Sequence, residues 1–256
     1  MNKKPIIITR GLVIREQAVG ESDRLATIFT ADMGVIRAFA RRAKVINDRK
    51  VSATSLLFYS RFELTKGRNS YIISDAFAID GFRELQKDLE KLSLALYFCD
   101  LVGEIVTEGE RAHDQLRLLL NVLKFAENGT FSVNMLKSIF ELRLLSLSGF
   151  MPDLNACEEC GETAALHNQA FFCPERGAVL CQSCRQIKNY SALAISNSCL
   201  NAMRVIAYGG PASCFNLRMP DRDWECLEDV TERYMVFTLQ RRLKTLDFYR
   251  SIQSMQ

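Results

Sequence analysis

Residues 56–79 read LLFYSRFELT, KGRN and SYIISDAFAI in three consecutive pieces, and they decide the fold of the first part of the chain. In the first piece Phe58, Phe62 and Leu64 alternate with polar side chains, and this period of two is typical of a β-strand with one buried face. Residues 66–69 supply Gly and Asn, which favour turns, and a second apolar run follows at once. The stretch therefore predicts a β-hairpin.

Comparable apolar runs lie upstream of this hairpin. Asp32 and Gly34 favour a turn between two of these runs, which predicts a second hairpin. Five short strands within 80 residues are typical of a small closed barrel. Alternating apolar positions place Phe39, Phe58 and Phe62 in the core of that barrel. The predicted strands span residues 5–15, 23–30, 34–41, 56–65 and 70–79.

From Phe82 onward the apolar period changes from two to about three and a half, which indicates amphipathic helices. Helices are predicted over residues 82–106, 116–128, 132–149, 198–208 and 221–245. The sequence therefore predicts an α+β protein. A β-barrel domain covers residues 1–80, and an α-helical domain over residues 81–256 carries a cysteine-rich insertion at about 155–190.

The composition is that of an ordinary folded protein. The chain has 256 residues, of which 48% are hydrophobic and 25% charged, and these values exclude fibrous and disordered classes. No uncharged apolar run approaches the roughly 20 residues that span a bilayer. The first ten residues contain only three consecutive isoleucines, too few for the apolar core of a signal peptide. We expect a cytoplasmic protein without membrane association.

Four of the nine cysteines form two CxxC units, CEEC at residues 157–160 and CQSC at 181–184, with 20 residues between them. Two such units can place four thiolates about 2.3 Å from one Zn²⁺ in a tetrahedron. Four protein ligands leave no open position for a catalytic water, so the sequence predicts a structural zinc ion. The predicted ligands are Cys157, Cys160, Cys181 and Cys184.

Alternatives to this ligand set remain open. A redox-active CxxC would give the same spacing, although it needs only one such unit at a strand-to-helix junction. Cys173 and His167 lie between the two units and could compete as ligands. The remaining cysteines are expected to be small buried hydrophobic residues, namely Cys99, Cys199, Cys214 and Cys226.

The positive charge is concentrated near the N-terminus. The net charge is only +3, but residues 1–80 hold 14 Lys and Arg against 8 Asp and Glu. Six cations fall within residues 37–50 beside a single acid, Asp48. A basic segment on a small barrel can contact several phosphates, which makes nucleic acid the leading ligand, with Tyr59 or Tyr71 as possible stacking faces. The alternative is an ordinary solvated surface run. The predicted DNA-binding residues are Arg24, Arg37, Arg41, Arg42, Lys44, Arg49, Lys50 and Arg68.

The order of a basic barrel, a helical body and a four-cysteine segment is similar to that of the bacterial RecO family. GLV at residues 11–13, GESDR at 20–24, ARR at 40–42 and FEL at 62–64 resemble landmarks of that family's OB-fold domain. FELR at 140–143 and GFMP at 149–152 resemble its helical domain. Residues 157–161 and 177–184 resemble its zinc-binding segment, so the likeness covers nearly the whole chain.

This resemblance implies a non-enzymatic, nucleoid-associated mediator of DNA recombination and repair in the RecF pathway. Such proteins bind single- and double-stranded DNA and anneal complementary strands. With RecR they help RecA to replace the single-stranded-DNA-binding protein (SSB) on DNA. The resemblance also implies that the helical domain contacts the acidic C-terminal tail of SSB. Candidate contacts on the predicted helices are Arg143, Arg204, Arg241, Arg242 and Lys244.

The residues themselves favour no enzymatic activity. The sequence has no GxxxxGK[ST] phosphate loop, no HExxH and only two histidines, neither of them beside an evident nucleophile. Scattered acids such as Glu104, Glu108 and Glu110 suit helix surfaces better than a nuclease centre. A second hypothesis is a zinc-containing protein-interaction adaptor without general DNA affinity, with a zinc-ribbon transcription regulator as a variant of it.

Overall fold

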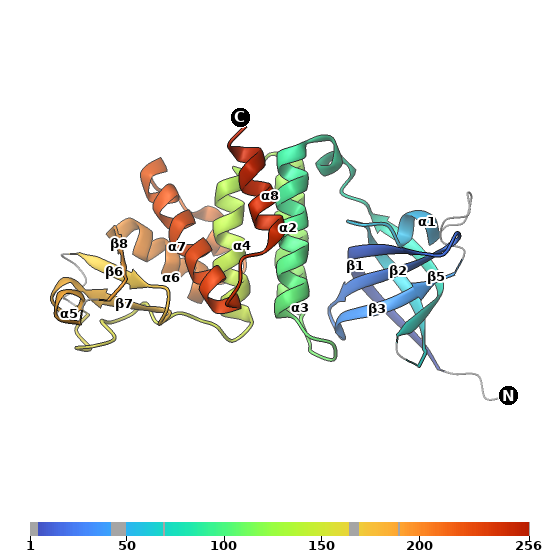
Figure 1. Cartoon of the computed structure of the whole chain (residues 1–256), viewed down its shortest axis with the longest axis horizontal. Coiled ribbons are helices and arrows are strands. Elements are labelled where there is room, and N and C mark those ends of the chain that lie inside the picture. The colour runs from blue at the N-terminus through green and yellow to red at the C-terminus, as the bar shows by residue number, and fades with distance from the viewer. Residues whose placement is uncertain (1–4, 42–49, 69, 164–168, 189, 256) are drawn as a thin grey trace. The chain divides into compact units, whose positions relative to one another are not determined.

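The computed structural model describes residues 5–41, 50–68, 70–163, 169–188 and 190–255 (Figure 1). It divides into two compact units. The first comprises Met1–Asn128 with Lys244–Gln256, and the second comprises Gly129–Leu243. The first unit holds the β-barrel and the second holds the cysteine-rich segment, so the protein is of the α+β class. None of the described helices combines the length and the apolar character that crossing a membrane requires.

The predicted barrel is confirmed. Its strands close in the order β1-β2-β3-β5-β4, with β3 and β5 parallel and the other neighbours antiparallel, which is the arrangement of an OB-fold. A register shift between Val13 and Arg15 interrupts the pairing of β1 with β2. The strands are β1 (Ile6–Val19), β2 (Asp23–Thr30), β3 (Gly34–Ala40), β4 (Tyr59–Lys66) and β5 (Tyr71–Asp80).

Small side chains allow this narrow barrel to close. Ala26, Ala38, Ala40 and Ala76 are fully buried together with larger residues such as Phe62. The prediction for Phe62 is therefore right, and Phe58 is also buried, at 9% exposure. The prediction for Phe39 is wrong, because Ile36, Ala38 and Ala40 face inward on β3 and the alternation turns Phe39 outward, where it is half-buried.

The helical part of the first unit begins later than predicted. Residues 83–87 form a 3₁₀ helix, η1 (Arg83–Lys87), after Phe82 in the left-handed region at φ 39°. The carboxylate of Asp88 then accepts the N–H groups of Glu90 and Lys91 at 3.0 and 3.2 Å, which starts a new helix. A single helix from residue 82 is thereby excluded. The α-helices of this unit are α1 (Lys50–Ala53), α2 (Leu89–Ile105), α3 (His113–Asn128) and α8 (Lys244–Gln253).

The turn between β2 and β3 connects the barrel to the helices. Gly34 has φ +63°, and a Cβ atom there would lie 2.0 Å from the carbonyl oxygen of Thr107. The N–H of Gly109 donates to the carbonyl of Met33 at 2.9 Å, and the N–H of Ala112 donates to that of Ala31 at 2.8 Å. Only glycine permits this approach of the barrel to the α2–α3 loop.

The second unit packs helices beside a small antiparallel sheet of order β7-β6-β8. The predicted helix over 221–245 is wrong at its C-terminal end. The backbone turns left-handed at Gln240, with φ 53°, so α7 stops and α8 starts separately at Lys244. The elements of this unit are α4 (Val133–Leu147), β6 (Ala170–Cys173), β7 (Ala178–Cys181), α5 (Gln182–Lys188), β8 (Leu193–Ile195), α6 (Asn197–Tyr208), η3 (Ser213–Asn216) and α7 (Asp221–Leu239).

Candidate functional site

The two CxxC units come together into one cluster. The Sγ atoms of Cys157, Cys160, Cys181 and Cys184 all lie within 4.8 Å of one another, and those of Cys160 and Cys181 are 4.0 Å apart. Four sulfurs bound at about 2.3 Å around one tetrahedral ion lie roughly 3.8 Å from one another. The cluster therefore has the dimensions and the donor atoms of a metal-ion site.

Local backbone structure positions the four thiols. Cys181 ends β7 and Cys184 lies in the first turn of α5, so the CQSC motif lies at a strand-to-helix junction. The CEEC motif forms a turn that is closed by the N–H of Gly161, which donates to the carbonyl of Cys157 at 2.8 Å. The N–H of Glu158 donates to the carbonyl of Val179 at 3.0 Å and ties this turn to β7. The sheet thus holds one CxxC unit against the other.

The surroundings of Cys157 favour its thiolate. Burial raises the pKa of this thiol, but backbone N–H groups of Cys181, Cys160 and Glu159 donate to its sulfur and bring the pKa down to about 7. The N–H of Cys181 lies 3.3 Å from Cys157 Sγ. Because the thiolate is the metal-binding form of cysteine, these donors favour that form at Cys157.

The acids between the first pair of cysteines have their own partners. The guanidinium of Arg176 donates to both carboxylate oxygens of Glu158, with Nη2 2.9 Å from Oε1. The hydroxyl of Tyr190 donates to Glu159 at 2.7 Å, and the same guanidinium lies 5.3 Å from the Tyr190 ring. The sequence spacing did not reveal these contacts, which brace the turn from outside.

Cys173 is not part of the cluster. It is fully buried on β6, and this burial raises the pKa of its thiol, which suits a core residue. Cys99, Cys199 and Cys214 are buried as expected, whereas Cys226 is half-exposed on α7. His167 lies outside the described residues.

The barrel brings some of the predicted DNA-binding residues together. The ammonium of Lys50, at the start of α1, donates to the main-chain carbonyl of Arg41 at 3.3 Å, so these two basic residues are neighbours in the fold beside the end of β3. Arg37 is exposed on β3, and Arg68 is exposed in the turn before β5. Arg42, Lys44 and Arg49 lie outside the described residues.

Arg37 has a mixed environment. It lines a cavity of about 280 Å³ with Arg15, Glu104 and Glu108, where the outer surface of the barrel meets α2. Arg15 itself pairs with Asp100 at 2.7 Å. The charge of Arg37 is thus partly offset by acids on and after α2, whereas Arg41 lies beyond the strand end.

Arg24 is placed differently from the other cations. Its side chain is only 12% exposed, and its Nη1 donates to the carbonyl of Val51 at 2.9 Å, to Thr54 Oγ1 at 3.2 Å and to Ser55 Oγ at 2.9 Å. It also lies 3.3 Å from Glu16 Oε2. These contacts tie β2 to α1, and no short-range pattern could have indicated them because the partners are 27 to 31 residues away.

Two of the arginines that are candidate contacts for an acidic tail donate hydrogen bonds to main-chain carbonyls of this chain. Arg143 Nη1 donates to the carbonyls of Ile206 and Ala207 at 2.9 Å each, at the end of α6. Arg204 Nε donates to the carbonyl of Leu154 at 2.9 Å. Arg241 is exposed after α7, and Lys244 begins α8 in the other unit.

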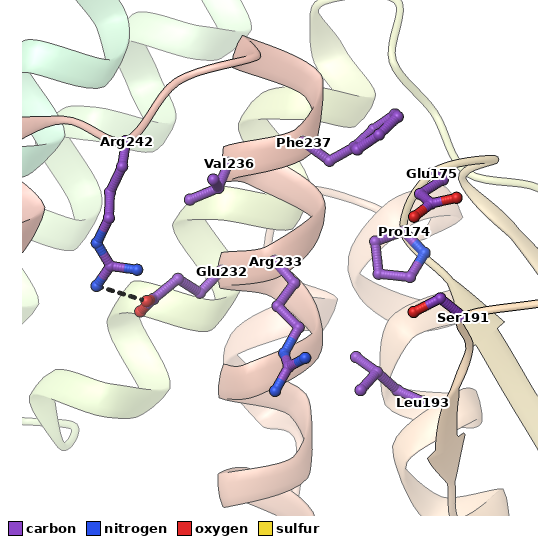
Figure 2. Close-up of a pocket in the computed structure, with 9 residues that line it drawn as sticks. All are labelled: Pro174, Glu175, Ser191, Leu193, Glu232, Arg233, Val236, Phe237 and Arg242. Carbon is purple, nitrogen blue, oxygen red and sulfur yellow. Dashed lines mark ion pairs between the residues drawn. The ribbon is translucent and has the colours of Figure 1, made fainter.

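A cavity of about 310 Å³ separates α7 from the strands of the cysteine-rich segment (Figure 2). Val236 and Phe237 of α7 line it across from Leu193. Figure 2 shows Arg242 directed at Glu232, with which it pairs at 3.2 Å. Two arginines and two glutamates line the cavity, so it carries no net positive charge: Arg233, Arg242, Glu175 and Glu232.

Comparison with known proteins covers both parts of the chain. Residues 1–82 match the family profile described as "Recombination protein O N terminal", and residues 86–247 match "Recombination protein O C terminal". The "DNA repair protein RecO" of Acetivibrio thermocellus is 32% identical over 244 residues, which are 95% of this chain and 96% of the relative. That of Symbiobacterium thermophilum is 30% identical over 245 residues, with the same coverage of the two chains. That of Desulforudis audaxviator is 37% identical over 178 residues, which are 69% of this chain and 70% of the relative. The barrel, the helical body and the thiol cluster thus occur in a chain that belongs to the RecO family of DNA repair and recombination proteins.

Proposed function

We propose that this protein is a recombination mediator that binds single- and double-stranded DNA and anneals complementary strands. With RecR it assists the loading of RecA onto SSB-coated DNA, in the cytoplasm and at the nucleoid. The observation that carries the proposal is the closed barrel of a RecO-family chain with Arg41 and Lys50 held together beside the end of β3. The DNA-binding domain is the barrel of residues 1–80, and the helical domain over 81–256 serves the protein partners.

In this proposal the cations of the basic segment bind phosphates without reading sequence. Each phosphate contact releases condensed counterions, which supplies affinity for any DNA. Annealing then follows from reduced repulsion between two polyanions held on one surface, and no covalent bond has to change. The phosphate ligands are Arg37, Arg41, Arg42, Lys44, Arg49, Lys50 and Arg68, whereas Arg24 acts as a positioning residue that fixes α1 and, with it, Lys50.

We assign zinc to the four-cysteine cluster, because thiolate donors in a tetrahedral set are the ligands that Zn²⁺ prefers. Cys157, Cys160, Cys181 and Cys184 would hold the ion and fill its coordination sphere. When bound, the ion supplies folding free energy and no reactive centre. The cluster joins a turn, a strand end and a helix start, and this arrangement supports a structural role.

We infer RecR and SSB as partners from membership of the RecO family alone. For the acidic SSB tail, the cavity of Figure 2 is a poor site because its arginines are matched by glutamates. Among the candidate arginines we take Arg241 as the tail contact because its side chain is exposed, whereas Arg143 and Arg204 are not fully accessible. Fluorescence polarisation of a labelled tail peptide tests this assignment. Binding that R241E weakens and R218E leaves unchanged supports it, and equal binding by both variants contradicts it.

The proposal is tested by fluorescence anisotropy of a labelled mixed-sequence oligonucleotide across a salt series. We expect binding that is indifferent to sequence, with a log–log salt slope of about −0.7 per phosphate contact on single strands. A duplex of the same sequence should also bind, and complementary strands should anneal faster with the protein than without it. Absence of binding at low salt contradicts the proposal and favours the protein-interaction adaptor.

A further inference from the structure

The outer surface of the barrel carries a row of apolar side chains that crosses strand after strand. Leu25 on β2 pairs with Phe39 on β3, and Phe39 pairs with Ile72 on β5. The row continues from Ile72 to Thr65 on β4 and from Thr65 to Ile6 on β1, which is 60% exposed. Leu25, Phe39 and Ile72 therefore follow one another sideways across the barrel exterior, and Thr65 separates them from Ile6.

These side chains are outside the barrel core. Their sequence neighbours Ala26, Ala38 and Ile73 fill the interior, and successive residues of a strand point to opposite faces. Leu25, Phe39 and Ile72 are each only half-buried. The centre of the row therefore offers an apolar surface with an aromatic ring in the middle.

Positive charge flanks this ring along β3. Arg37 precedes Phe39 by two residues and Arg41 follows by two, and both are exposed. The ammonium of Lys50 lies at the carbonyl of Arg41. An apolar ring between cations suits a ligand that combines flat apolar groups with anions at short, regular spacing, and single-stranded nucleic acid has this chemistry.

We propose that Phe39, with Leu25 and Ile72 on either side, is a stacking platform for unpaired bases. The inference deepens the proposed function and rests on it. The three residues cover two strand spacings, about 10 Å at roughly 4.8 Å each, which is room for two or three bases. A duplex hides its base faces, so the platform discriminates single strands from duplexes while the cations bind both.

Tryptophan fluorescence tests the platform directly. The chain has one tryptophan, Trp224 on α7 in the other unit, and W224F provides a background without indole emission. In F39W/W224F we expect oligo-dT to quench the emission of the new indole, and a duplex to leave it nearly unchanged. F77W/W224F is the matched control, because Phe77 is also a half-buried ring near an arginine, 5.8 Å from the Arg61 guanidinium, but lies on β5 outside the row. Equal quenching at both positions, or none at position 39, overturns the platform.

Affinity measurements separate stacking from packing. F39A should weaken binding of oligo-dT roughly tenfold and binding of a duplex by less than about twofold, since only unpaired bases can stack on the ring. F39L keeps an apolar side chain without a ring, so it should lose nearly as much as F39A if stacking matters. Circular dichroism and thermal unfolding of all variants establish that the barrel remains folded.

The outcomes distinguish this inference from the function on which it rests. Wild-type protein that binds neither oligo-dT nor duplex overturns both. Wild-type protein that binds both, with F39A and F39L equal to wild type, overturns the platform alone. If F39L retains the wild-type affinity while F39A loses it for single strands and duplexes alike, Phe39 merely supports the barrel and the platform is again overturned.

Discussion

Arg41 and Lys50 are joined by a hydrogen bond of 3.3 Å from the Lys50 ammonium to the Arg41 main-chain carbonyl, although nine positions separate them in sequence. The bond brings the residue that follows β3 next to the first residue of α1. The Lys50 ammonium therefore lies against the main chain of a second basic residue at this end of the barrel. In the proposed function this arrangement would favour phosphate binding, because Lys50 is positioned before DNA arrives.

Removal of these charges should reduce DNA binding and annealing together. The variant R41A/R42A/R49A/K50A deletes four cations, and its salt slope on single strands should fall by up to about 2.8, at roughly 0.7 per lost contact. Anisotropy across a salt series measures the slope, and annealing of labelled strands measures the rate. The control K87A/R111A/R117A/R222A removes the same charge from exposed positions on or near helices. If the first variant anneals as fast as wild type, the DNA surface lies elsewhere.

Substitution of Arg24 should act on stability. In R24A the carbonyl of Val51 and two hydroxyls lose a shared charged donor, and we expect the free energy of unfolding to fall by about 1–3 kcal/mol. R24K keeps the charge without the planar fork of donors and should recover little. R10A, at an exposed position on β1, is the control and should be nearly neutral. Denaturant unfolding measures all three. Wild-type stability in R24A, with DNA binding lost and then restored by R24K, would show that Arg24 is a phosphate ligand instead.

The sequence predicted the five strands and the grouping of the cysteines because both depend on short spacings. A period of two fills one face of a strand, and the CxxC spacing places two thiols in one turn. The same period of two also places Phe39 on the outward face of β3. Phe39 lies two residues from Arg37 and from Arg41, so it shares their outward side, as the inward Ala38 and Ala40 of the structure make plain.

The helix ends and the long-range contacts could not be predicted in this way. The apolar period of the sequence continues across Asp88 and Gln240. In the structure the Asp88 side chain caps the start of α2, and the left-handed backbone of Gln240 ends α7. The role of Arg24 depends on acceptors in α1, which reach it only after the barrel has closed. The partners of Arg24 are distant in sequence, so a local pattern does not contain them, whereas the Asp88 cap and the Gln240 turn are local but leave no mark on the apolar period.

Loss of the cluster metal should unfold part of the second unit. Protein as purified should contain one zinc ion per chain by atomic absorption, and C157S/C181S should contain none. The double variant should also lose helical circular dichroism and unfold at a lower temperature, because the ion joins a turn, a strand end and a helix start that are separate in sequence. C226S removes a half-exposed thiol outside the cluster and should keep both the zinc and the stability. An unchanged unfolding temperature in C157S/C181S would contradict a structural ion.

A buried ion network between α4 and α7 should be sensitive to partial removal and tolerant of complete removal. Lys137 Nζ lies 2.8 Å from Glu141 Oε1 and 2.9 Å from Glu232 Oε2, with Lys137 and Glu141 fully buried. K137M leaves the two carboxylates without this cation and should cost about 3–5 kcal/mol of unfolding free energy. The triple variant K137M/E141L/E232L removes all three charges and should regain most of that loss. K124M breaks a half-exposed pair with Glu127 and should cost less than about 1 kcal/mol. If denaturant unfolding finds K137M no less stable than K124M, the network contributes nothing to holding α4 against α7.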